Sequence, residues 1–308
     1  MKVPAMTLKT MIRVLAVAAC VGFATVAPNA GAGQAPGTAQ AVPAAPGTAA
    51  PAPGRGRGPQ PVDPRVQIRM HHFAETNQEI PYSLFVSSKV KKNKKAPLIV
   101  TLHGLGGTHT TMMRPVALDL AEANGDIMVA PMGYNPRGWY GIPRGVRRGG
   151  PPGNPAPATI PPALNGANDP PNVRELSEKE TLEVIDLVRK EFKIDDDRTY
   201  LMGHSMGGAG TYYLAVKYPK QWAAIAVLAP AAFSLDPNSL AKIPKMPVMV
   251  VHGDMDTAVP VSLSRNWVEA MTSLKIPHQY IEVPGGDHGS VITSHQAEVF
   301  AFFAKHKR

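Results

Sequence analysis

Short apolar runs alternate with segments of helical periodicity along most of the chain. The runs predict buried strands at residues 97–102, 126–131, 200–203, 223–228, 247–251 and 279–283. Residues 175–192 form a strong amphipathic helical pattern, and further helices are expected at residues 209–218, 265–274 and 295–303. Strands that alternate with helices predict an α/β domain whose mostly parallel central sheet has helices on both faces.

The beginning of this domain has a different pattern. Residues 65–73 and 80–86 are alternating or apolar runs, and the polar residues 75–79 separate them. This arrangement predicts an antiparallel hairpin at the N-terminal edge of the sheet. The domain would extend over residues 65–308, which is long enough for one sizeable core.

One long segment, residues 134–172, departs from the alternation. It is rich in Pro, Gly and Asn and is too long and irregular for an ordinary connection. Because it follows a predicted strand, we expect it to lie over the active-site edge of the sheet and to shape a pocket. Tyr134, Trp139 and Tyr140 are candidate substrate contacts, although Trp139 could instead anchor the loop to the body. The arginines of this loop could bind an anion or be solvated.

The amino terminus has the organisation of a secretory signal. Lys2, Lys9 and Arg13 precede the apolar residues 14–27, and small residues follow. This pattern predicts a signal peptide over residues 1–32 and a secreted or periplasmic protein. The apolar run is too short to predict a stable membrane span.

Two further features of this region bear on its fate. Cys20, the only cysteine of the chain, lies in a stretch similar to a bacterial lipoprotein processing site, so a lipid anchor is the alternative to cleavage of a signal. Residues 33–64 consist largely of Ala, Pro, Gly, Thr and Gln and predict a disordered linker.

The chain is basic, with a formal net charge of +9. Five lysines lie within residues 89–95, in the loop before a predicted strand. Such a cluster can bind nucleic acid. A lysine-rich surface turn is the ordinary explanation, however, so no nucleic-acid partner is expected.

The sequence Gly-His-Ser-Met-Gly at residues 203–207 lies between a predicted strand and a predicted helix. A serine on such a turn has its hydroxyl exposed, and small residues two positions before and after it let the strand and helix pass closely. Ser205 is therefore a candidate nucleophile. An ordinary glycine-rich turn is the alternative interpretation of this motif alone.

A nucleophilic serine needs a base, and the base needs a carboxylate that orients it. The predicted strand at residues 247–251 leads into a loop with Asp254 and Asp256, and the last predicted strand leads into a glycine-rich loop with His288. The chain order Ser, Asp, His is the order in which α/β hydrolases present these groups.

Four segments together carry a resemblance to a known family. They are LHGLGG at 102–107, GHSMGG at 203–208, HGDMDTAVP at 252–260 and GDHG at 286–289. In this order they resemble the α/β-hydrolase superfamily over residues 65–308. Within it, the chain is similar to secreted esterases of the feruloyl esterase and polyhydroxybutyrate depolymerase type, and to the catalytic domain of prolyl oligopeptidase-like hydrolases. The resemblance implies the α/β-hydrolase fold.

The resemblance also assigns roles to residues. The family pattern places the acid at Asp256, with Asp254 as the fallback. It implies that the amides of Met206 and Leu105 bind the oxyanion, with Gly106 as the alternative to Leu105.

These observations predict a secreted serine hydrolase that cleaves carboxylic esters through Ser205, His288 and Asp256 and an acyl-enzyme intermediate. The expected substrate is a small-molecule or polysaccharide-linked ester, and no metal or organic cofactor is implied. One alternative is a serine peptidase of the prolyl oligopeptidase type. Another is a non-catalytic binding module on a hydrolase fold. The amino-acid sequence does not indicate an oligomeric state.

Overall fold

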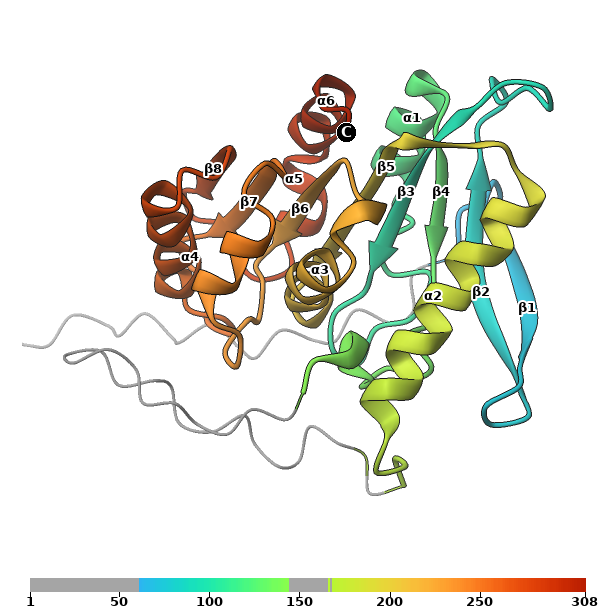
Figure 1. The fold of residues 1–308 in the computed structure, drawn as a ribbon, viewed down its shortest axis with the longest axis horizontal. Helices are drawn as coiled ribbons and strands as arrows, with labels where there is room; N and C mark the ends of the chain where they lie inside the picture. The colour runs from blue at the N-terminus through green and yellow to red at the C-terminus, as the bar shows by residue number, and fades with distance from the viewer. Residues whose placement is uncertain (1–60, 144–165, 167) are drawn as a thin grey trace, which may run out of the picture. The chain divides into compact units, whose positions relative to one another are not determined.

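The computed structural model describes residues 61–143, 166 and 168–308. A sheet of eight strands crosses this part of the chain in the order β1-β2-β4-β3-β5-β6-β7-β8 (Figure 1). The strands are β1 (Gln67–Phe73), β2 (Gln78–Val86), β3 (Ala96–Leu102), β4 (Ile127–Ala130), β5 (Ile194–His204), β6 (Ala224–Leu228), β7 (Val248–Gly253) and β8 (His278–Val283). β2 is antiparallel to β1 and β4, and the other neighbouring strands are parallel. The predicted mostly parallel sheet with an antiparallel edge hairpin is confirmed.

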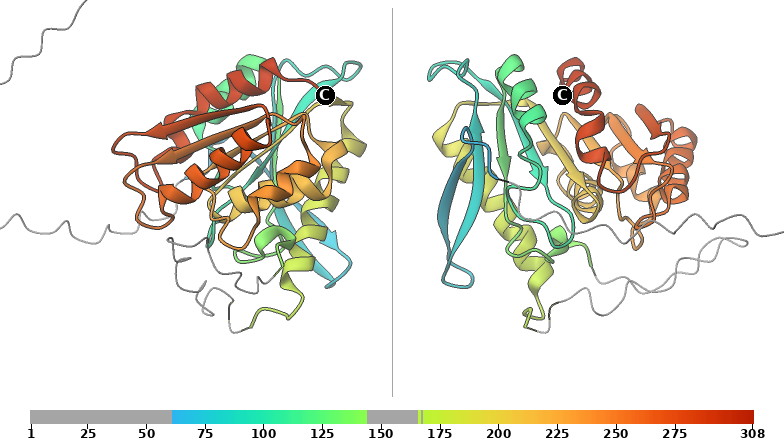
Figure 2. Two further views of the ribbon diagram at one scale, coloured as in Figure 1. Left: turned by 60° about the vertical axis from the view of Figure 1, so that its left-hand side comes forward. Right: turned by 180° about the vertical axis from the view of Figure 1, so that it is seen from behind.

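Helices cover both faces of this sheet (Figures 1 and 2). The α-helices are α1 (Pro115–Asn124), α2 (Val173–Glu191), α3 (Met206–Lys217), α4 (Val261–Ser273), α5 (Val291–Ser294) and α6 (Gln296–Lys305). The short 3₁₀ helices are η1 (Trp139–Gly141), η3 (Pro219–Gln221) and η4 (Pro237–Lys242). Helices α1, α5 and α6 pack on one face, and α2, α3 and α4 pack on the other.

The two helical layers explain why the central strands are continuously apolar. Every residue of β3 is buried. Leu98, Val100 and Leu102 pack into the cluster that contains α2, α3 and α4, whereas Ile99 packs into the cluster that contains α1 and α6. Because successive side chains of a strand point to opposite faces, a strand covered on both sides needs apolar residues at every position.

Two elements differ from the prediction. Strand β5 begins at Ile194, several residues earlier than expected, because its polar first part extends beyond the buried stretch. Helix α1 has no counterpart in the predicted elements. Its buried face consists only of Ala117, Leu118 and Ala121, which is too small a stripe to give a clear helical pattern.

The predicted signal peptide at residues 1–32 lies outside the described residues, and so does Cys20. The predicted linker, residues 33–64, is described only from residue 61 onward. There Arg65 donates hydrogen bonds to Asp63 and to Asp119 of α1. In the part of the chain that the structure describes, no helix combines the length and the apolar character needed to cross a membrane.

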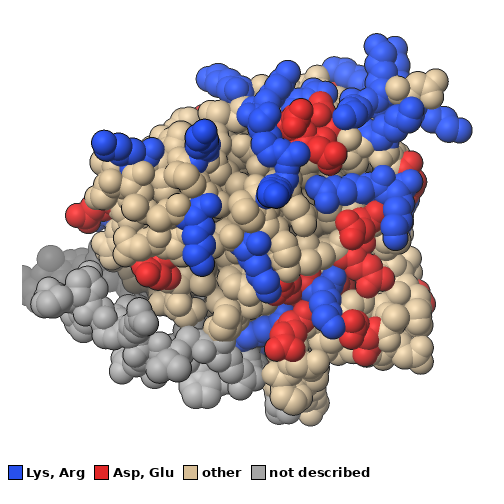
Figure 3. Space-filling view, in the orientation of Figure 1, with Lys and Arg blue, Asp and Glu red and all other residues tan. Residues whose placement is uncertain are grey.

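The basic residues gather at one end of the molecule. Figure 3 shows many of the Lys and Arg side chains of this face at the end that carries the loop between β2 and β3. Residues 91–95 of this loop are exposed. The loop precedes β3, whereas Ser205 follows the parallel strand β5. The lysine-rich loop and Ser205 therefore lie at opposite ends of the strands.

Candidate active site

Ser205 lies on a sharp turn between β5 and α3. Its backbone has φ 55° and ψ −116°, a conformation that residues with a side chain rarely adopt. Such strain costs on the order of 1–3 kcal/mol and persists only where the surrounding structure enforces it. Here the Ser205 amide donates to the Leu228 carbonyl at 2.9 Å, and the Ser205 carbonyl accepts from the amides of Ala209 and Ala231. The turn is therefore fixed by β6 and by the segment that follows it.

The glycines around Ser205 are required by close backbone contacts. A Cβ atom at Gly203 would lie 2.3 Å from the Gly207 carbonyl oxygen, and one at Gly207 would lie 2.2 Å from the Leu102 carbonyl oxygen. Both distances are far below van der Waals contact. The spacing of the motif thus follows from the way β5, α3 and the end of β3 meet.

Asp256 and His288 form a direct pair. His288 Nδ1 lies 2.6 Å from Asp256 Oδ2, and the other carboxylate oxygen accepts hydrogen bonds of 2.8 Å from the amides of Ala258 and Val259. The Asp256 side chain is buried. A buried carboxylate with this many donors is well placed to stabilise a cation on the histidine ring.

Asp254, the other candidate acid, has a different environment. Its side chain accepts a hydrogen bond of 2.7 Å from the Gly285 amide and is exposed. It therefore ties the loop after β7 to the loop after β8. The structure brings Asp256, and not Asp254, to His288.

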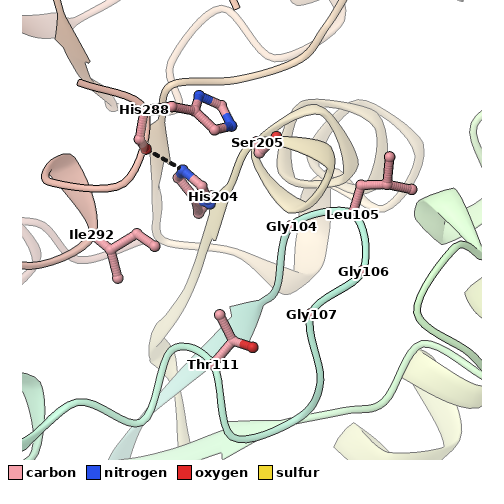
Figure 4. Close-up of a pocket in the computed structure, with 9 residues that line it drawn as sticks. All are labelled: Gly104, Leu105, Gly106, Gly107, Thr111, His204, Ser205, His288 and Ile292. Atoms are coloured by element: carbon pink, nitrogen blue, oxygen red, sulfur yellow. Dashed lines mark hydrogen bonds between the residues drawn. The ribbon is translucent and has the colours of Figure 1, made fainter. Parts of the chain in front are cut away.

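His288 and Ser205 line the same cavity, which has a volume of about 280 Å³ (Figure 4). Figure 4 shows the His288 ring beside the Ser205 side chain. Among the described residues, no hydrogen bond joins the two side chains. In unliganded enzymes the hydrogen bonds between catalytic groups are often long, and they shorten when substrate binds. The other residues that line the cavity are Gly104, Leu105, Gly106, Gly107, Thr111, His204 and Ile292.

His204 supports the His288 loop from within the protein. Its Nε2 lies 2.7 Å from the His288 carbonyl oxygen, and the two rings are 4.6 Å apart. Burial, together with the neighbouring His288 ring, lowers the pKa of His204 to about 4. His204 is therefore neutral near pH 7, and we assign its proton to Nε2 because the carbonyl can only accept.

The backbone amides near Ser205 differ in what they already bind. The Gly106 amide donates to the Pro136 carbonyl at 2.9 Å, and the Gly107 amide donates to the Gly104 carbonyl. Within residues 61–143, 166 and 168–308, the Leu105 amide has no acceptor. Met206 is the first residue of α3, so its amide has no acceptor inside the helix. Leu105 and Met206 are thus among the amides available to a ligand, whereas Gly106 is not.

The aromatic residues of the loop after β4 do not line the cavity. Trp139 and Tyr140 are 3% and 0% exposed, so the expectation that they contact substrate is wrong. The Tyr140 hydroxyl donates to the His103 carbonyl at 3.1 Å, and its amide donates to Ser177 Oγ. Both rings therefore anchor the loop, which for Trp139 is the alternative that the sequence left open.

The remaining residues of this loop have other partners. Tyr134 packs against Phe73, with ring centroids 6.0 Å apart, and does not line the cavity. Arg137 pairs with Asp169 at 3.3 Å, and Arg174 donates to the Ile142 carbonyl. The other arginines of the segment, Arg144, Arg147 and Arg148, lie outside the described residues.

Several residues of the site are not among the predicted ones. Thr111 and Ile292 line the cavity. His252, at the end of β7, is completely buried beside Asp256. In the sequence, the one signal for His252 is its place as the first residue of the HGDMDTAVP segment at 252–260, because its contact with Asp256 arises only in the folded chain. Among the described residues, no cluster of His, Cys, Asp and Glu side chains is arranged to bind a metal ion.

Comparison with known proteins agrees with this geometry. Residues 167–306 match the Phospholipase/Carboxylesterase family model. A thermostable esterase of known structure has 26% identical residues and a TM-score of 0.59, and the match covers 79% of this chain and 64% of that chain. The chain has the α/β-hydrolase fold.

Two further proteins of known name are similar to this chain. A CE1 ferulic acid esterase from Anaeromyces mucronatus, 19% identical, has a TM-score of 0.58 over 80% of this chain and 92% of that chain and so shows the shared fold. Cutinase 1 from Thermobifida cellulosilytica is 33% identical over 96 residues, which make up 31% of this chain and 35% of the cutinase. The match thus spans about a third of the length of that relative.

The lowered pKa of His204 makes a prediction about stability. In the unfolded chain a histidine has a pKa near 6.5. Between pH 6.5 and about 4, the unfolded state therefore binds more protons than the folded state does. The stabilisation associated with neutral His204 is therefore complete above pH 6.5 and is lost as the pH falls toward 4. We measure the free energy of unfolding with urea at pH 7 and at pH 4. Between these values it should fall by about 2–3 kcal/mol more in the unsubstituted protein than in His204→Gln.

His204→Gln is a suitable reference because its amide can still donate to the His288 carbonyl. The other buried histidines with a lowered pKa, His103 and His252, are present in both proteins. Equal pH dependence in the two proteins would contradict the assignment of a neutral His204.

Proposed function

We propose that this α/β hydrolase is a serine esterase that cleaves carboxylic esters through an acyl-enzyme intermediate. The observation that supports this most strongly is the Asp256–His288 pair, 2.6 Å long, whose histidine lines the same cavity as a serine on a strained turn. A free serine hydroxyl is nearly inert at neutral pH, and a base oriented by a buried carboxylate is what activates it.

In the proposed reaction, Ser205 Oγ attacks the ester carbonyl while His288 Nε2 takes the serine proton. Asp256 binds His288 Nδ1 at 2.6 Å, so it fixes the tautomer with Nε2 unprotonated and stabilises the imidazolium that forms. His288 then donates this proton to the leaving alcohol. In the second half, His288 takes a proton from water while the water oxygen attacks the acyl carbonyl. His288 then returns this proton to Ser205 Oγ as the bond to the acyl group breaks, which releases the acid and restores the free serine.

The negative charge on the carbonyl oxygen would be bound by the amides of Leu105 and Met206. The Gly106 amide, the alternative donor, already donates to the Pro136 carbonyl. Met206 begins α3, so the positive end of the helix dipole adds to its amide. Each such donor is worth on the order of a hundredfold to a thousandfold in rate.

The walls of the cavity favour an apolar acyl or aryl group. Leu105 and Ile292 line it, and Leu105 is partly exposed there. The relatives named as cutinases and as a ferulic acid esterase agree with an ester substrate. The proposed substrate is a small-molecule or polysaccharide-linked ester. We also propose export, on the basis of the signal-like pattern of residues 1–32.

Removal of the nucleophile tests this proposal directly. We expect Ser205→Ala to lower kcat for ester hydrolysis by about 10⁶, because the remaining groups cannot form the acyl-enzyme. The assay would use p-nitrophenyl esters of graded chain length, methyl ferulate and a proline-containing peptide amide, with circular dichroism as the control for folding.

The same panel separates the rival functions. Ester turnover that depends on Ser205, with little amide cleavage, is the expected result. Faster cleavage of the amide would favour a peptidase, and a folded protein that turns over none of the compounds would favour a binding module.

The assignment of the acid is tested by a matched pair of substitutions. Asp256→Asn should lower kcat by about 10⁴, because an amide oriented toward His288 Nδ1 no longer stabilises the required tautomer and the imidazolium. Asp254→Asn should lower kcat less than about tenfold, since Asn can still accept from the Gly285 amide. A larger loss in Asp254→Asn than in Asp256→Asn would overturn the assignment.

A further inference from the structure

His252 is a completely buried histidine whose ring lies between Asp256 and helix α4. Its Nε2 is 3.1 Å from Asp256 Oδ2 and 2.9 Å from the Val259 carbonyl oxygen. Its Nδ1 is 2.7 Å from Ser264 Oγ, and Ser264 is also completely buried. Both ring nitrogens therefore have partners, and these partners come from the loop after β7 and from α4.

The partners define the protonation state of the His252 ring. Both neighbours of Nε2 are acceptors, so we assign the proton to Nε2, which donates to them. The Ser264 hydroxyl then donates to the unprotonated Nδ1. Burial lowers the pKa of His252 and so favours this neutral form.

We propose that His252 is a positioning residue for the acid of the triad. It donates its Nε2 hydrogen to Asp256 Oδ2, the same oxygen that accepts from His288. It thereby fixes the plane of the carboxylate and reduces the negative charge that His288 experiences. This inference rests on the proposed function, since it assigns His252 a part in the same reaction.

The geometry indicates a role beyond packing. Asp256 Oδ1 is held by the amides of Ala258 and Val259, whereas Oδ2 has His288 and His252 as its donors. Without His252, rotation of the carboxylate would be limited on the Oδ2 side by His288 alone. The hydrogen bonds from Ser264 through His252 and Asp256 to His288 form one chain, and such chains strengthen each member.

Other titratable groups also face this chain. His204 lies beneath the His288 ring, Asp287 interacts electrostatically with His288, and Glu282 interacts electrostatically with His252. Arg265 of α4 binds Glu282. These groups remain unchanged in the substitutions below, so they set the same background for each protein.

The test compares two substitutions of His252. His252→Leu removes the donor to Asp256, whereas His252→Gln retains an amide donor at a similar distance along the side chain. We expect His252→Leu to lower kcat about tenfold with KM nearly unchanged, because a carboxylate that can rotate no longer holds the His288 ring in one orientation. We expect His252→Gln to retain most of kcat.

The pKa of His288 is the decisive readout. A carboxylate that has lost a donor attracts the imidazolium more strongly, so the pKa of His288 should rise by about one unit in His252→Leu. This shift would be followed in the acidic limb of kcat/KM and, independently of turnover, by NMR titration of the His288 ring, assigned with His288→Gln. Ser264→Ala, which leaves the His252 ring in place, should raise the pKa of His288 by a smaller amount.

Val248→Ala provides the control, because it weakens the opposite end of β7 without touching Asp256. It should leave the pKa of His288 unchanged.

An unchanged His288 pKa in folded His252→Leu, or equal losses of kcat in the Leu and Gln variants without such a shift, would overturn the proposal. If His252→Leu does not fold, an unchanged His288 pKa in Ser264→Ala would overturn it. A shift by NMR in a protein that hydrolyses no ester would support the inference while the proposed esterase failed.

Discussion

The strained turn at Ser205 is the constraint on which the rest of the site depends. Ser205 adopts φ 55° because β5 must pass directly into α3 while Gly203, Gly207 and the end of β3 are in backbone contact. The same contacts have three consequences. The serine side chain projects from the turn, the Met206 amide lies at the start of a helix, and the loop that begins with Gly104 comes beside both. One backbone arrangement therefore provides a candidate nucleophile and a candidate oxyanion donor.

Asp256 is the second point at which separate parts of the chain converge. Its four hydrogen bonds come from two amides of its own loop, from His252 of β7 and from His288 of the loop after β8. The His288 loop is in turn held by His204, which immediately precedes Ser205. Two buried histidines with a lowered pKa therefore support the His288–Asp256 pair: His204 contacts the backbone of His288, and His252 contacts the carboxylate. Because these histidines are desolvated, they can act as donors without adding positive charge.

Much of the architecture was predictable from the sequence, for identifiable reasons. The central strands are covered on both faces, so each reads as a continuous apolar run, and the turn at residues 203–207 uses glycines at the positions where a side chain would collide. The short helix α1 was missed because its buried face is made of three small or medium side chains.

Contacts between distant segments could not be inferred from local patterns. Trp139 and Tyr140 lie in a segment without a regular pattern and are predicted as substrate contacts, but Tyr140 fits against Gly133 and Gly210 and is fully buried. Nothing in the spacing of His252 indicated its contact with Asp256, which depends on how the loop after β7 folds back. The placement of Ile292 in the cavity likewise depends on the packing of α5.

Activation of Ser205 can be tested by covalent labelling of the full chain with a p-nitrophenyl alkylphosphonate, followed by intact mass measurement and peptide mapping. An activated Ser205 predicts one phosphonate per protein, located on this serine, and release of one equivalent of p-nitrophenol. A label on another residue, or a folded protein that takes up no label, would contradict the claim that Ser205 is an activated nucleophile.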